Sequence, residues 1–148
     1  MILVADASFA AKVLLDEQGS DIARWWWRND DATWLAPAII AAEVEAAFGV
    51  HHRRHPKDFG AQRRKLASTT WAAMLDGIVL HKLDRTVTDE AVRLIQDHGP
   101  LRGADACYIA VAVLLAREPG VDVVLGSFDH QQRRAALEAG VPLTKPLP

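Results

Sequence analysis

The sequence predicts an α/β protein in which a mainly parallel central sheet is covered by helices on both faces. Short apolar runs, typical of buried strands, alternate along the chain with longer segments whose apolar residues recur at helical spacing. Most of those helical segments are too short to be stable alone, so they need a sheet to pack against. Half of the residues are apolar and 24% are charged, a balance that supplies a core and excludes extended disorder.

The first two elements meet at an acidic residue. Residues 2–5 form a wholly apolar run, which is typical of a strand buried on both faces, and Asp6 ends it. Residues 7–15 carry apolar side chains at helical spacing, and either Asp6 or Ser8 can cap that helix. The chain therefore begins as strand, acid and helix.

The next segment predicts a helix over residues 18–28 and a short strand over residues 33–36, which Pro37 stops. Pro37 also suits the first turn of the following helix. That helix carries a periodic apolar stripe over residues 39–50 and ends in the basic cluster of residues 51–55.

The rest of the chain continues the same alternation of elements. We expect helices over residues 57–75, 87–96, 104–116 and 131–139, strands over residues 78–80 and 121–125, and an edge strand over residues 141–143. This alternation indicates parallel strands, whose carboxyl ends meet at one edge of the sheet.

Length and composition limit the possible classes of function. The 148 residues predict a single domain over residues 1–148, and a net charge of −2 requires any nucleic-acid binding to be local. The lone Cys107 excludes an internal disulfide and is more typical of a small core residue than of a nucleophile. Apolar runs such as residues 109–116 are shorter than the roughly 20 residues of a membrane span. We therefore expect a cytoplasmic protein with no membrane segment.

Four carboxylates are candidates for a functional site. Asp6 follows the first strand directly, and Asp129 follows Leu125 after three further residues, so both should lie at the carboxyl edge of the sheet. Glu43 and Asp105 lie inside apolar segments, where burial of an unpaired carboxylate is costly.

Each carboxylate also has an ordinary structural interpretation. Asp6, Asp105 and Asp129 can cap helices, and Glu43 can pair with a helical neighbour. As a set, however, they have no obvious basic partner, and their mutual repulsion favours a multivalent cation. Oxygen-only ligands favour Mg²⁺ or Mn²⁺, an ion that can activate water and offset charge on a phosphodiester. The set therefore predicts metal-assisted phosphodiester hydrolysis.

Four short motifs follow one another in an order that is found in a known family. They are Val4-Ala5-Asp6-Ala7-Ser8, Ala36-Pro37 through Glu43, Arg102-Gly103-Ala104-Asp105-Ala106, and Ser127-Phe128-Asp129. In this order the motifs resemble those of the PIN-domain ribonucleases, and more narrowly the VapC-type toxins, over nearly the whole chain. The resemblance implies a PIN-like three-layer α/β/α sandwich with a mainly parallel central sheet.

The resemblance also implies roles for particular residues and partners. The metal-binding, catalytic acids of an Mg²⁺- or Mn²⁺-dependent endoribonuclease would be Asp6, Glu43, Asp105 and Asp129. The family often has a threonine two positions before its last acid, where this chain has Ser127, and its hydroxyl keeps a supporting hydrogen bond available. A homodimer is implied, together with a VapB-type antitoxin that masks the site and an RNA substrate (tRNA, rRNA or mRNA).

A local basic stretch follows the third predicted helix. Its candidate RNA-binding residues are Arg53, Arg54, Arg63, Arg64 and Lys65. A solvated helical hairpin explains the same charges.

His51 and His55 have the spacing of two metal ligands on one helix face, but zinc needs further ligands, so we expect no zinc site.

Three consecutive tryptophans form a further candidate for binding. Trp25, Trp26 and Trp27 cannot all face one core, because adjacent helical residues point about 100° apart. We expect at least one to be exposed and to mark a dimer or antitoxin contact, which a Trp26→Ala variant would test. Ordinary core packing is the alternative.

Other functions fit the sequence less well. A receiver domain needs adjacent acids after its first strand, whereas Asp6 stands alone. Aspartate-nucleophile phosphatases usually carry a second Asp where this chain has Ser8, and they would leave Glu43 without a role. The remaining alternative is a PIN fold that binds RNA or a protein without cleaving anything.

Overall fold

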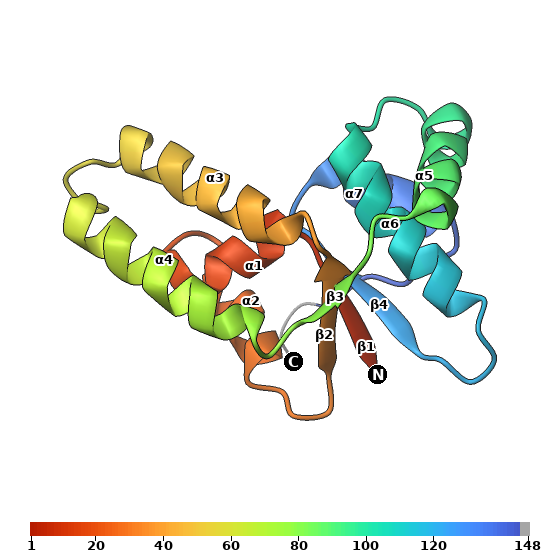
Figure 1. Cartoon of the computed structure of the whole chain (residues 1–148), viewed down its shortest axis with the longest axis horizontal. Helices are drawn as coiled ribbons and strands as arrows, with labels where there is room; N and C mark the ends of the chain where they lie inside the picture. The colour runs from red at the N-terminus through yellow and green to blue at the C-terminus, as the bar shows by residue number, and fades with distance from the viewer. Residues whose placement is uncertain (146–148) are drawn as a thin grey trace.

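The computed structural model describes residues 1–145 and contains a four-stranded sheet whose strands are all parallel (Figure 1). The strands are β1 (Ile2–Ala5), β2 (Thr33–Pro37), β3 (Val79–His81) and β4 (Val123–Gly126). Their order is β3-β2-β1-β4, so β1 and β2 are central. Val4 of β1 pairs with Leu35 on one side and with Leu125 on the other.

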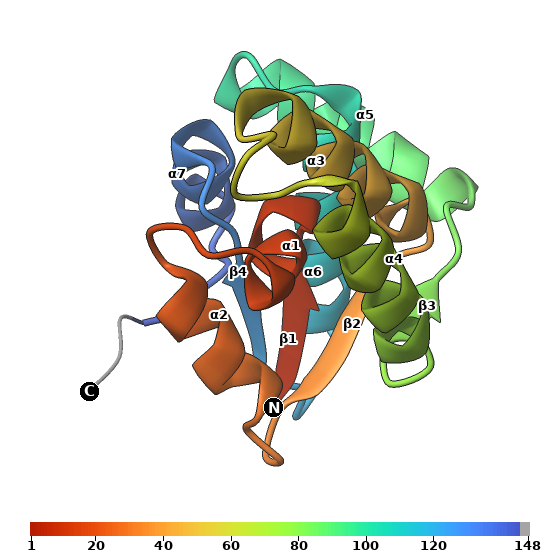
Figure 2. The same ribbon diagram turned by 90° about the vertical axis from the view of Figure 1, so that its left-hand side faces the viewer.

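Helices cover both faces of this sheet. In residues 1–145 they are α1 (Ala7–Leu14), α2 (Ser20–Trp27), α3 (Ile40–Arg54), α4 (Ala61–Leu75), α5 (Arg85–His98), α6 (Gly103–Ala116) and α7 (His130–Glu138). Figure 2 shows β1 and β2 with α1, α2 and α4 in front and α6 behind. The predicted three-layer sandwich is confirmed, and α3 and α4 form a hairpin that extends from it (Figure 1).

The core lies on both faces of the central strands. Leu3, Val4 and Ala5 are fully buried, as predicted for the first apolar run. On one face they meet α6, which is buried from Ala106 to Val113 apart from Cys107 and is in turn covered by α5.

No single helix in residues 1–145 is long and apolar enough to cross a membrane. The pair α5 and α6 passes that test only jointly, and the two helices meet at 107°.

Two expectations about the element boundaries are wrong. Pro37 does not begin a helix but ends β2, where it pairs with His81, and the next amide, of Ala38, donates to the His81 carbonyl. The edge strand expected over residues 141–143 is reduced to a single parallel bridge between Leu125 and Leu143. Pro142 has no amide hydrogen with which to continue a ladder.

The three tryptophans of α2 have three different environments. Trp25 is 43% exposed and packs edge-on against Trp26, which is buried at 6%, while Trp27 contacts Trp34. The expectation of an exposed tryptophan is confirmed, but the choice of Trp26 for testing an interface is wrong. Its indole belongs to the core, so Trp25 is the residue available to a partner.

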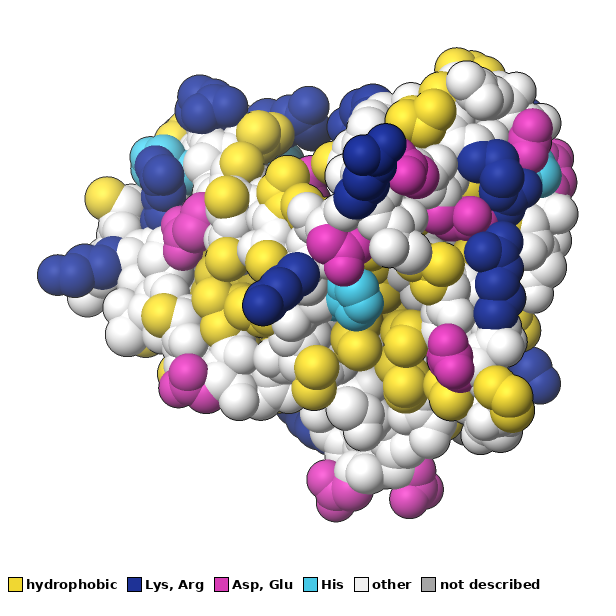
Figure 3. Space-filling model, turned by 45° about the vertical axis from the view of Figure 1, so that its right-hand side comes forward, with side chains coloured by type: hydrophobic (Ala, Val, Ile, Leu, Met, Phe, Trp, Pro, Cys, Tyr) yellow, Lys and Arg dark blue, Asp and Glu magenta, His cyan; other side chains and the backbone are white. Residues whose placement is uncertain are grey.

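The opposite edge of the sheet also exposes apolar side chains. Val79 and Leu80 of β3 are 51% and 44% exposed, because β3 has a neighbour on one side only. On the face shown in Figure 3, hydrophobic side chains gather between charged side chains of both signs. The charged side chains limit the continuity of the apolar surface.

Candidate active site

Asp6 lies where β1 ends and α1 begins. Its carboxylate caps α1 by accepting a 2.7 Å hydrogen bond from the Phe9 amide, and the Ser8 hydroxyl donates to it at 2.8 Å. Burial raises the pKa of Asp6 to about 6, although the Ser127 hydroxyl, the Phe9 amide and the Ser8 hydroxyl oppose the rise. The sequence thus places a carboxylate in a position where its negative charge is poorly solvated.

Glu43 lies in the first turn of α3 and is held from the other side of the sheet. The hydroxyl of Tyr108, on α6, donates a 2.6 Å hydrogen bond to Glu43 Oε2. Tyr108 is 1% exposed, and its burial together with Glu43 raises the pKa of the phenol, which therefore stays protonated as a donor. The alternative interpretation of Glu43, a pairing with a neighbour on its own helix, is wrong, because its partner is Tyr108 in another layer.

Asp105 lies in the first turn of α6 and has a basic partner. Arg102 donates to it through Nε at 2.7 Å and through Nη2 at 3.2 Å, and Nη2 lies 3.7 Å from Asp129 Oδ2. The hydrogen bond to Asp105 raises the pKa of Arg102 further. The expectation that the acids have no basic partner is therefore wrong, and the i, i+3 spacing of Arg102 and Asp105 was the available signal.

Asp129 caps α7 with one carboxylate oxygen. Its Oδ1 accepts from the amides of Gln131 and Gln132, both at 2.9 Å. Oδ2 is the oxygen that faces Arg102. The capping interpretation is thus confirmed for Asp6 and Asp129 but is wrong for Asp105, since residue 102 is the N-cap of α6. The cap does not use Oδ2, whose contact is the 3.7 Å approach of Arg102.

Ser127 and Gln132 join the loop after β4 to α6. The buried Ser127 hydroxyl accepts from the Asp129 amide at 3.0 Å and donates to Gln132 Oε1 at 2.7 Å. Gln132 Nε2 in turn donates to the backbone carbonyl of Asp105 at 3.2 Å. The sequence indicated Ser127 but gave no role to Gln132, whose position in the first turn of a polar helix resembles that of any solvated residue.

The four carboxylates lie around one hollow of about 530 Å³, together with Ser8, Lys12, Arg102, Tyr108 and Phe128. A larger hollow of about 840 Å³ beside α2 contains none of these four acids. The hollow lined by the four acids lies at the carboxyl edge of the sheet, where parallel α/β sheets bind their ligands. Lys12 Nζ lies 4.8 Å from the centre of the Phe128 ring at its border.

The donor set of this hollow fits a hydrated divalent cation better than zinc. The carboxylates offer only oxygen, and within residues 1–145 no three Asp, Glu, His or Cys side chains lie close enough together to hold a metal ion as they stand. Glu43 is hydrogen-bonded by Tyr108 and Asp105 by Arg102. An oxygen-only donor set suits Mg²⁺, which keeps several of its waters, whereas zinc favours nitrogen and sulfur ligands.

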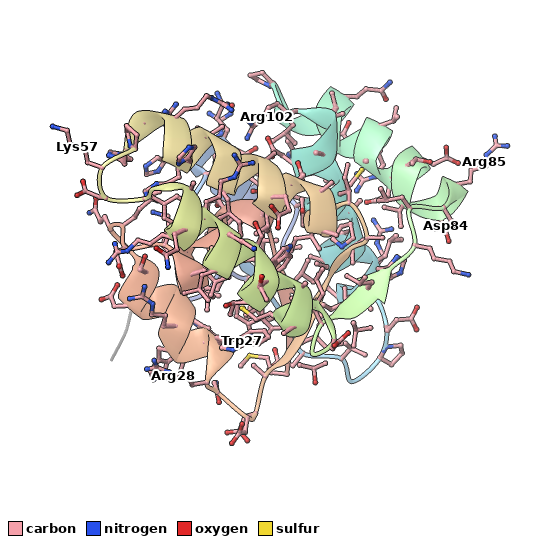
Figure 4. All side chains as sticks on the ribbon, turned by 60° about the vertical axis from the view of Figure 1, so that its left-hand side comes forward. Trp27, Arg28, Lys57, Asp84, Arg85 and Arg102 are labelled. Atoms are coloured by element: carbon pink, nitrogen blue, oxygen red, sulfur yellow. The ribbon has the colours of Figure 1, made fainter. Side chains whose placement is uncertain are left out.

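The predicted RNA-binding residues do not form one patch at the acids. All five are exposed on the α3–α4 hairpin, whose tip carries Lys57 (Figure 4). Arg54 lines a hollow that adjoins the acidic one. The guanidinium groups of Arg53 and Arg64 instead lie beside Gly49, and Arg63 donates to the Asp58 carbonyl at 2.8 Å.

Comparison with known proteins agrees with this architecture. The family model described as PIN domain matches residues 3–138. The crystal structure of VapC20 of Mycobacterium tuberculosis, described as a toxin that cleaves the sarcin-ricin loop, superposes with a TM-score of 0.66 at 17% identity, covering 99% of this chain and 100% of that one. A search of the curated proteins gave no match. Since the family model covers most of the chain and the fold agrees with it, the chain belongs to the PIN domain family.

Proposed function

We propose that this PIN domain is a metal-dependent endoribonuclease of the VapC type, the toxin of a type II toxin-antitoxin pair. The observation that carries the proposal is the convergence of Asp6, Glu43, Asp105 and Asp129 on one hollow. They come from the ends of two strands and the first turns of two helices. The fold likeness to VapC20, a toxin described as cleaving an RNA loop, supports the same function.

The four acids would hold Mg²⁺ or Mn²⁺ as a common site. When bound, such an ion lowers the pKa of a coordinated water and offsets negative charge at the phosphate. Asp6 contributes a buried carboxylate, whose poor solvation favours an approaching cation. Asp129 keeps Oδ2 available, because its cap uses Oδ1 alone.

Neighbouring residues hold these acids in position. Tyr108 fixes Glu43 through its hydroxyl, and the pair of Ser127 and Gln132 fixes the backbone that carries Asp105 and Asp129. Arg102 supplies an exposed cation at the border of the hollow, where a phosphodiester would enter. These residues position and orient, while the four carboxylates contact the reacting centre.

The partners follow from the same proposal. A VapB-type antitoxin would mask the hollow, the substrate would be a structured RNA in the cytoplasm, and two copies of the single domain would form a homodimer. The exposed indole of Trp25 supports a protein contact at α2, because a partly exposed tryptophan is a common anchor of interfaces.

The test is cleavage of total cellular RNA by the purified protein with Mg²⁺ or Mn²⁺. We expect discrete fragments that disappear with EDTA and in Asp6→Asn, a variant that removes a buried charge and should stay folded. Asp89→Asn, which removes the same charge from a 69% exposed side chain of α5, is the matched control and should cleave normally.

An absence of cleavage by the folded, antitoxin-free protein with either ion would contradict the proposal. The chain would then be a PIN module that binds RNA or a protein without cleaving it. Cleavage that survives both EDTA and Asp6→Asn would instead identify a contaminating nuclease.

A further inference from the structure

A second hollow of about 420 Å³ adjoins the acidic one, in the groove between α1 and α3. The two hollows adjoin, because both are lined by Ser8, Lys12, Ala47, Val50 and Arg102. Both helices begin beside the acids, since Asp6 caps α1 and Glu43 lies in the first turn of α3. The groove therefore leads from the candidate active site toward the C-terminal ends of these helices.

The charge of this groove is opposite to that of the acidic hollow. It is lined by Lys12, His51, Arg54, His55 and Arg102, with Glu17 as its one carboxylate. Glu17 is already paired, because it lies 3.3 Å from Lys12 Nζ and 2.7 Å from His51 Nδ1. Arg54 forms no ion pair within residues 1–145, so its charge is available to an anion.

The other basic side chains of the groove follow one another along it, as contacts to an extended anion require. The rings of His51 and His55 pack at 4.8 Å between centroids, which places two imidazoles in succession along α3. Lys12 is fixed between the two hollows by Glu17, by the Gln18 carbonyl at 2.6 Å and by the Phe128 ring. At the junction, Arg102 reaches from α6 (Figure 4). Arginine, lysine and imidazole N–H donors along a groove can contact successive phosphates of a single strand.

An acidic hollow repels a polyanionic substrate, so affinity has to come from a neighbouring surface. We propose that Arg54, His51, His55 and Lys12 bind the backbone phosphates of the RNA strand beside the cleaved bond, with Arg102 at the junction. This inference rests on the proposed ribonuclease function and adds the path of its substrate. It also assigns RNA binding to only part of the basic stretch, because Arg54 lines this groove while Arg53 lies with Arg64 beside Gly49.

Basic residues near helix ends also interact with the helix dipole, and that role requires no RNA. The adjacent arginines separate the two explanations. Arg53 and Arg54 have the same charge and lie in the same last turn of α3, so their dipole contributions are alike. Only Arg54 lines the groove.

The experiment measures binding of labelled oligouridylate by fluorescence anisotropy in EDTA, which keeps the RNA intact if cleavage requires a metal. We expect Arg54→Gln to weaken binding by about three- to tenfold and to lower the salt slope by about 0.7. Arg53→Gln should have a clearly smaller effect. Arg85→Gln, at the far end of the molecule (Figure 4), should have none.

If Arg53→Gln and Arg54→Gln lose equal RNA affinity, the proposed RNA path through the groove is wrong and the binding surface is diffuse. A second arm replaces the RNA with polyglutamate. Wild-type protein that binds polyglutamate but no RNA would overturn the proposal in favour of an acidic protein segment. If RNA binding depends on Arg54 but the protein cleaves no RNA with Mg²⁺ or Mn²⁺, the groove binds RNA and the proposed nuclease activity is contradicted.

Discussion

Arg102 forms a two-point ion pair with Asp105 at the border of the acidic hollow, with distances of 2.7 and 3.2 Å. The same guanidinium lies 3.7 Å from Asp129. Because the Arg102 side chain is 77% exposed, water and salt weaken this pair, and it exchanges readily. A cation that binds these two carboxylates has to compete with Arg102.

Replacement of Arg102 should therefore strengthen metal binding. We expect Arg102→Gln to bind Mn²⁺ about two- to fivefold more tightly, the effect of removing one exposed competing pair. Isothermal titration of the RNA-free protein measures this affinity, and Arg85→Gln controls for the loss of one positive charge. Equal affinity in Arg102→Gln and wild type would show that the ion does not contact the acids held by Arg102.

Removal of the Tyr108 hydroxyl should disturb Glu43 and leave the fold in place. Tyr108→Phe keeps the buried ring but loses the donor to Glu43 Oε2. We expect metal affinity or kcat to fall by about 10- to 100-fold, with little change in the KM for RNA.

A matched variant distinguishes this positioning role from simple destabilisation. Trp34→Phe removes a buried hydrogen bond, to the Trp26 carbonyl, at the opposite end of the sheet. It should lower the unfolding temperature and leave metal affinity unchanged. A Tyr108→Phe protein with wild-type metal affinity and kcat would exclude a role for this hydroxyl in positioning Glu43.

Glu90 should stabilise the fold far from the candidate site. It is 9% exposed and pairs with Arg93 of its own helix and, at 2.9 Å, with Arg117 at the end of α6. At neutral pH, we expect Glu90→Gln to lower the free energy of unfolding by about 1–3 kcal/mol. Glu118→Gln, an exposed change next to Arg117, is the control and should have little effect.

The contribution of Glu90 should depend on pH. The hydrogen bond from Arg93 is the main cause that lowers the pKa of Glu90 below its usual 4.5. For a carboxyl with a lowered pKa, stabilisation is fully present above the unfolded value and is lost as pH falls through the folded value. Urea denaturation at several pH values should show the difference between wild type and Glu90→Gln shrinking below about pH 4.5. A constant difference would contradict the ion pair.

The two neighbouring tryptophans should respond differently to truncation. Trp26→Ala removes a buried side chain and should destabilise the protein by about 3–5 kcal/mol. Trp25→Ala should leave stability nearly unchanged but reduce dimer mass in light scattering, or affinity for the antitoxin in calorimetry. If both association measurements are unaffected in Trp25→Ala, this indole is not part of an interface.

The sequence alone determined the architecture and the positions of the four acids. Alternation of apolar runs and helical stripes depends on local periodicity, which needs no knowledge of distant contacts. Asp6 and Asp129 could be placed at one edge because both follow strands that are parallel. Glu43 and Asp105 were found because a carboxylate within an apolar segment is costly unless it has a purpose.

Tertiary structure decided what each of these acids contacts. The partner of Glu43 is Tyr108, which lies 65 positions away in the sequence and on the other layer of the fold. No local pattern encodes that pairing, nor the burial of Trp26 rather than Trp25, because both depend on the direction in which a helix faces its neighbours. The same holds for Arg53 and Arg54, since adjacent residues on a helix point about 100° apart and only packing decides which one meets the groove.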